Sequence, residues 1–136
     1  MNTDFINPNA IREVFGFLVD EFHYSIARDE ILFHEQRDYG FILDYVRKDR
    51  RVHLSHDYKE NFFDFRIIRG LDTRYPNDHD RENIVSFWRL FKSFEPSLEL
   101  KALQPDGQTC AEAASINAQL LRKYATKVLQ GKEWIY

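Results

Sequence analysis

The sequence has few of the residues that cross-link a chain, bind metal or anchor it in a membrane. Cys110 is the single cysteine among 136 residues, which excludes an intramolecular disulfide and any metal site built from several cysteines. No apolar run approaches the roughly 20 residues of a membrane-spanning helix. Residues 1–4 also lack the basic and apolar regions of a signal peptide. We therefore expect a cytoplasmic protein without a membrane partner.

Signatures of the common enzyme classes are missing as well. The chain has no glycine-rich phosphate loop, no G-x-S-x-G elbow and no H-E-x-x-H pair. His53 and His56 are close in sequence, but at three residues apart on a strand they point to opposite faces and cannot share an ion. We expect no metal and no cofactor, and the net charge of -3 argues against a nucleic-acid partner.

Alternation of apolar and polar residues across 39–69 predicts an antiparallel meander. The alternation is interrupted only at 48–50 and 59–60, and breaks this short permit hairpins. Tips at 49–50 and 59–60 predict that Tyr45 lies opposite Leu54 and that Leu54 lies opposite Phe65. One face of the sheet is then apolar throughout.

Helical spacing of apolar residues marks three other segments. The first covers residues 7–22, and the second begins near Ile84 and stops before Pro96. The third begins at a capping box formed by Thr109 and Glu112, and it ends at Gly131. A first strand is expected within 23–38, an extended segment at 98–103, and a tail at 134–135 that folds back onto the core.

These segments together predict a single α+β domain over residues 1–136. It consists of an N-terminal helix, an antiparallel meander sheet of about four strands, and two C-terminal helices packed on one sheet face.

The polar face of the predicted meander gathers side chains known from hydrolytic chemistry. The predicted register places Asp44 opposite Ser55 and Ser55 opposite Asp64, with His53 in the next row. Two strand spacings separate the carboxylates by roughly 9.6 Å, near the upper limit for an inverting pair. A flat sheet face offers no pocket to shift their pKa values, so cross-strand ion pairing is the simpler interpretation. A small hydrolase that uses Asp44, Asp64 and His53 remains an alternative.

Two surfaces are candidates for binding another protein. In the loop over residues 72–82, an aromatic residue suited to a hot spot lies among acids: Asp72, Tyr75, Asp78, Asp80 and Glu82. On the sheet face away from the core, apolar residues interrupt the polar ones: Ile42, Val46, Phe62 and Ile68. Residues 1–30 hold six acids against two arginines, which either steer a basic partner or form a solvated helix face.

Residues 45–57 (YVRKDRRVHLSHD), 120–124 (LLRKY) and 129–135 (LQGKEWI) resemble small uncharacterised bacterial α+β proteins, some of them similar to immunity proteins encoded beside toxins. The resemblance implies the fold and no functional residue. We expect a non-catalytic protein-binding domain of the immunity or adaptor kind. A small hydrolase and a homo-oligomeric structural protein are the alternatives, and the oligomeric state is left open.

Overall fold

A meander sheet forms the centre of the molecule. The computed structural model describes residues 8–34, 37–57, 62–70, 83–104, 110–132 and 134. The fold is α+β as the sequence predicts, with five strands where about four were expected. The strands are antiparallel and lie side by side in chain order: β1 (Ser25–His34), β2 (Arg37–Arg47), β3 (Arg50–Asp57), β4 (Phe62–Arg69) and β5 (Ile84–Ser86).

Strand pairing confirms one predicted register and corrects the other. Between β3 and β4, Leu54 lies opposite Phe65 as predicted. Between β2 and β3, Tyr45 lies opposite Val52, so the predicted pairing of Tyr45 with Leu54 is wrong by two residues. A shift of two preserves the side-chain faces, and the predicted apolar face is therefore correct.

The error arises at the turn between β2 and β3. The connection consists of Lys48 and Asp49 alone, and Lys48 adopts a positive φ of 50°. Two-residue hairpins require such backbone angles, which glycine and asparagine usually supply. With lysine in that position, the sequence does not show where the turn lies.

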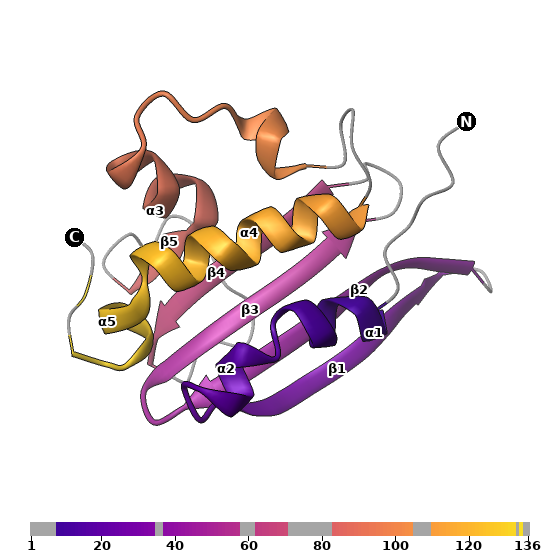
Figure 1. The fold of residues 1–136 in the computed structure, drawn as a ribbon. Helices are drawn as coiled ribbons and strands as arrows, with labels where there is room; N and C mark the ends of the chain where they lie inside the picture. Colours follow the sequence, from indigo (N-terminus) through magenta and orange to yellow (C-terminus); the bar gives the residue numbers. More distant parts are fainter. Residues whose placement is uncertain are drawn as a thin grey trace.

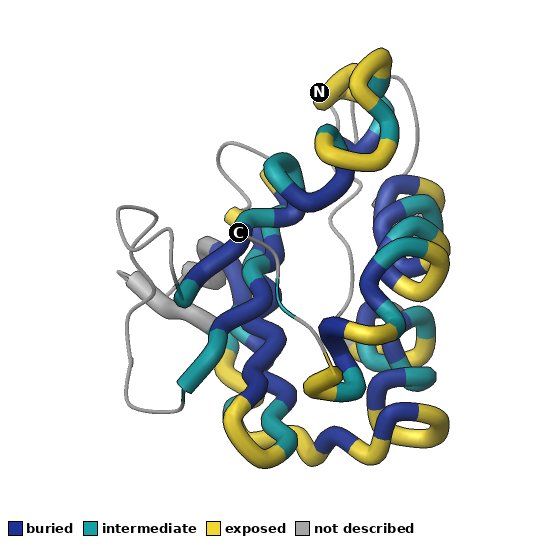
Figure 2. Tube along the Cα trace, turned by 90° about the vertical axis from the view of Figure 1, so that its left-hand side faces the viewer, coloured by how far each residue is buried: buried dark blue, intermediate teal, exposed yellow. Residues whose placement is uncertain are grey.

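The helices form a second layer on one face of the sheet (Figure 1). In Figure 2, buried residues concentrate where the two layers meet, and exposed residues lie on the outward side of the helices. None of the helices in the described ranges is both long and apolar enough to cross a membrane. The helices are α1 (Pro8–Val14), α2 (Phe17–Asp20), α3 (Phe87–Phe94), η1 (Leu100–Leu103), α4 (Cys110–Tyr124) and α5 (Thr126–Leu129).

Helix boundaries differ from the sequence prediction in four places. The first helix is divided at residues 15–16, and the last is divided at Ala125. Residues 84–86, expected to be helical, form β5, and α3 begins after Ser86, whose hydroxyl accepts a hydrogen bond from the Arg89 amide. The segment 98–103, expected to be extended, contains the short helix η1.

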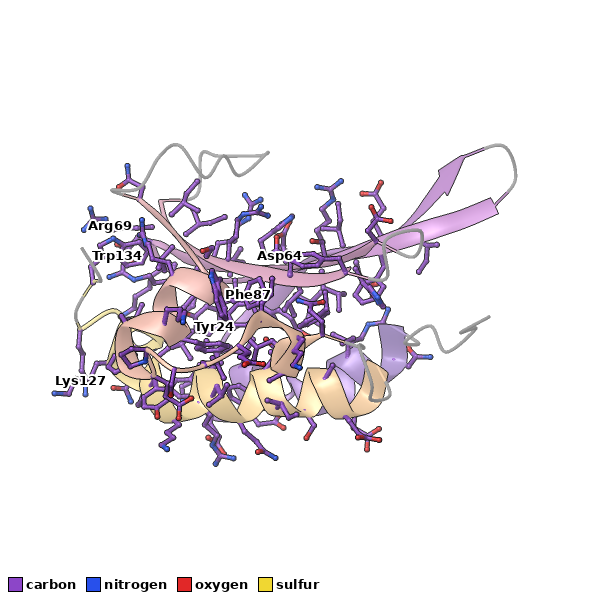
Figure 3. All side chains as sticks on the ribbon, turned by 90° about the horizontal axis from the view of Figure 1, so that it is seen from above. Tyr24, Asp64, Arg69, Phe87, Lys127 and Trp134 are labelled. Carbon is purple, nitrogen blue, oxygen red and sulfur yellow. The ribbon has the colours of Figure 1, made fainter. Side chains whose placement is uncertain are left out.

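Long-range hydrogen bonds join the helices to the sheet inside the core. The Tyr24 hydroxyl donates to the Leu129 carbonyl at 2.7 Å, and Figure 3 shows Tyr24 between the sheet and α4. The Gln104 side chain bonds to both backbone groups of Phe63, accepting from the amide at 2.7 Å and donating to the carbonyl at 2.6 Å. Gln104 thus occupies the position of a neighbouring strand beside β4.

The C-terminal tail returns to the end of the sheet, as predicted. The Arg50 and Arg69 guanidinium groups lie 4.9 and 5.1 Å from the Trp134 ring centroid, and Trp134 packs against the core (Figure 3). Cations over an indole face are favourable. The structure therefore gives Trp134 a packing role.

Candidate functional site

The candidate site lies on the sheet face opposite the helices, which we call the outer face. Its side chains become more exposed from the end that holds Ile68 and Ile84 toward the end that holds Asp57 and Phe62. Ile68 and Ile84 pair across β4 and β5 at one end and are 0% and 2% exposed. At the other end Asp57 and Phe62 pair across β3 and β4, and both are exposed. Along the described parts of β3, β4 and β5, the end at Asp57 and Phe62 is the more exposed one.

A buried cluster of ionisable groups occupies the middle of the outer face. Asp44 lies opposite His53, and its carboxylate is 2.6 Å from His53 Nδ1 and 3.3 Å from Arg51 Nε. Asp44, Arg51 and His53 are all buried. Burial alone would raise the pKa of Asp44, but the hydrogen bond and charge of His53, together with Arg51, outweigh burial and lower it. Asp44 is therefore an ionised carboxylate that positions an imidazole.

A hollow of about 280 Å³ opens beside this imidazole. Apolar walls from Ile42 and Phe62 surround polar groups from His53, Ser55 and Asp64. Phe41, His56 and Asp57 complete the lining. A small concave site with apolar walls and a few polar groups is the usual form of a binding pocket.

The observed register rearranges the predicted acid and hydroxyl row. Ser55 lies opposite Asp64 as predicted, but it lies opposite Ile42 and not Asp44. Asp44 instead shares a row with His53 and Arg66. The carboxylates predicted to form a pair are therefore in different rows, and each has an arginine partner, at 2.8 Å for Asp64 and Arg66.

Of the residues predicted to bind a partner, two line the hollow. Ile42 and Phe62 form its walls, while Val46 is half-buried and Ile68 is fully buried at the closed end of the face. The loop residues Asp72, Tyr75, Asp78, Asp80 and Glu82 lie outside the described residues. The open surface predicted for this face is therefore confined to the end that holds Ile42 and Phe62.

Sequence reasoning missed several contributors to the site, of which two are charged. Arg51 holds Asp44, and Asp57 lines the hollow. Arg51 lies two residues before His53, and residues two apart share a face of a strand. The sequence therefore indicated that Arg51 lies on the same face as His53. The two-residue error in register hid the contact, because it paired Asp44 with Ser55.

Among the described residues, no group of three or more histidine, cysteine, aspartate or glutamate side chains could hold a metal ion. Searches against protein families, curated proteins and solved structures find no match to this chain.

Proposed function

We propose that this protein is a non-catalytic protein-binding domain whose outer face receives a side chain of its partner. The observation that carries the proposal is the hollow at the open end of that face. An immunity or adaptor role in a bacterial cytoplasm is the form of this function that the sequence resemblance supports.

The size of the hollow supports insertion of a side chain. Its volume of about 280 Å³ lies at the lower limit of small-molecule pockets, which typically begin near 300 Å³. Hot spots in protein interfaces are often single aromatic or arginine side chains held in such pockets. The site therefore suits one anchor residue of a partner.

The lining favours a basic anchor. Asp57 supplies an exposed carboxylate, Asp64 supplies a second that also pairs with Arg66 at 2.8 Å, and the Phe62 ring supplies an aromatic surface, with Phe62 38% exposed. An arginine combines these contacts, because its guanidinium pairs with carboxylates and stacks on aromatic rings. The acidic stretch over residues 1–30 adds long-range attraction for such a partner.

Site-specific photo-crosslinking in cells tests the proposal. A photo-reactive phenylalanine analogue at Phe62 should capture one partner protein. The same analogue at Phe94, which is 47% exposed on the helix side, is the matched control. The captured protein should bind the purified domain, and Ile42→Asp should weaken that binding. Absence of a product at Phe62, or equal capture at Phe94, would exclude the hollow as the interface.

The small hydrolase remains a second candidate because of one observation, the 2.6 Å contact between Asp44 and His53 beside the hollow. A carboxylate that orients a histidine is a frequent part of hydrolytic sites. However, the side-chain hydrogen bond that the structure gives His53 is to Asp44, and Ser55 lies two residues away on the same strand. Hydrolysis of model esters or glycosides that disappears in His53→Gln would favour the enzyme.

A further inference from the structure

The two edges of the sheet differ in how much of the edge strand is covered. At the β4 side, β5 covers the edge over three residues, and the Gln104 side chain bonds to Phe63 beyond it. At the other side, β1 is the last strand and runs for ten residues. Within the part of the chain that the structure describes, no strand pairs with its outward edge.

The edge of β1 is accessible to another chain. Ser25, Ile26, Ala27, Asp29 and Glu30 are all exposed, and Ile26 is 44% exposed. Irregular pairing with β2 is confined to the positions next to Arg28 and after Leu32, which leaves 28–32 as a regular stretch. An unpaired regular edge presents backbone groups that can pair with another strand.

Charges along this stretch are arranged so that they complement a second copy. Arg28 and Glu30 share the outer face, where they lie opposite Asp44 and Ile42 of β2 and form an ion pair at 2.8 Å. Asp29 points to the helix side and is bound by Arg12 of α1. On the outer face, the positive charge of Arg28 therefore comes just before Asp29 and the negative charge of Glu30 just after it.

We propose that β1 pairs with β1 of a second copy, antiparallel and centred on Asp29, in a twofold dimer. This register places Arg28 of each copy opposite Glu30 of the other, and opposite charges facing each other stabilise antiparallel pairs. Arg12 neutralises the two Asp29 carboxylates that meet at the axis. The pairing continues one sheet across both copies and removes the free edge.

Charge disfavours the neighbouring registers. Centring the pair on Arg28 would place two arginines opposite each other, and centring it on Glu30 would do the same with two glutamates. Like charges directly opposite one another are destabilising. The outer-face charges thus favour the alignment centred on Asp29 over the two beside it.

Sedimentation velocity on the full chain, over a concentration series, tests the dimer. Arg28→Glu or Glu30→Arg should each raise the dissociation constant by about tenfold or more, because two like-charged pairs form by symmetry. The double exchange, Arg28→Glu with Glu30→Arg, restores opposite charges and should return the constant to within about threefold of wild type. Glu13→Arg, an exposed change on α1, is the matched control and should have no effect.

Amide hydrogen exchange of the wild-type protein tests the dimer without any substitution. In wild type, exchange of the β1 amides should slow as the protein concentration rises. A wild type that stays monomeric at millimolar concentration, a double exchange as weak as either single variant, or β1 exchange independent of concentration would each overturn the dimer. None of these outcomes bears on the hollow, which lies over β2, β3 and β4.

Discussion

At the residue scale, the charge on Asp44 links three buried polar groups of the outer face. Its carboxylate contacts both His53 and Arg51 while only 5% of the residue is exposed. An arginine left buried without this partner would be costly. Because the folded pKa of Asp44 lies below its unfolded value, the ionised carboxylate stabilises the fold.

The first prediction follows from that pKa. The stabilisation is fully present above the unfolded pKa of about 3.9, and it is lost as the pH falls through the lower folded pKa. Asp44→Asn should therefore reduce the free energy of unfolding by about 2 kcal/mol at pH 7. The difference from wild type should shrink steadily below about pH 4.

Urea denaturation from pH 7 to pH 2.5 measures this dependence. Asp57→Asn, on the same face but exposed, is the control and should change stability little. A loss for Asp44→Asn that is equally large across the whole pH range would contradict the stabilising role of the charge.

A second prediction compares two buried tyrosines. Burial raises the pKa of both Tyr24 and Tyr45 to about 12, so both hydroxyls are neutral. The Tyr24 hydroxyl donates to Leu129, whereas the Tyr45 hydroxyl makes no hydrogen bond with the described part of the chain. Tyr24→Phe should cost about 1 kcal/mol, and Tyr45→Phe should be neutral or stabilising, because an unpaired buried hydroxyl is unfavourable. Thermal melts showing equal losses would refute this difference.

At the element scale, the alternation of apolar and polar residues predicts which side chains face the core, but it does not predict where the turns lie. Alternation across 39–69 correctly predicts which residues of β2, β3 and β4 face the core, because a shift of two residues preserves the faces. It does not locate the turn at Lys48, because a lysine at positive φ has no sequence signal.

Helix spacing misled the prediction where a strand leads directly into a helix. Ile84, Phe87 and Phe91 fit one apolar stripe, but Ile84 belongs to β5 and Phe87 begins α3. Ile84 lies on the outer face with Ile68, whereas Phe87 and Phe91 belong to the core, so the helical spacing spans two elements that bury different faces. The pairing of Asp44 with His53 and the hollow depend on the exact register of three strands, which is why the sequence did not show them.

The side chain of Gln104 gives a third prediction, which concerns the edge of β4. Gln104 is 7% exposed and satisfies both backbone groups of Phe63. Gln104→Leu should reduce stability by about 2 kcal/mol, since it leaves a buried amide and carbonyl unpaired. Gln119→Leu, on the exposed face of α4, is the matched control. Equal chemical denaturation midpoints for the two variants would contradict the edge role of Gln104.

At the scale of the whole molecule, the helices cover one face of the sheet, and the two proposed binding surfaces lie elsewhere on it. The hollow opens on the outer face. The β1 edge lies at the side of the same sheet, as Figure 1 shows. A protein bound in the hollow and a second copy bound at β1 would use different residues. The domain can therefore present its outer face to a partner from both halves of a dimer.

The most direct measurement of the central claim is calorimetric titration of the crosslinked partner with two matched variants. Ile42→Asp places a carboxylate on the wall of the hollow, while Val19→Asp makes the same change on α2, where Val19 is 39% exposed. With both variants folded, Ile42→Asp should weaken binding by at least about tenfold, or 1.4 kcal/mol, and Val19→Asp should leave it unchanged. Unchanged affinity for Ile42→Asp, or an equal loss for Val19→Asp, would contradict binding through the hollow.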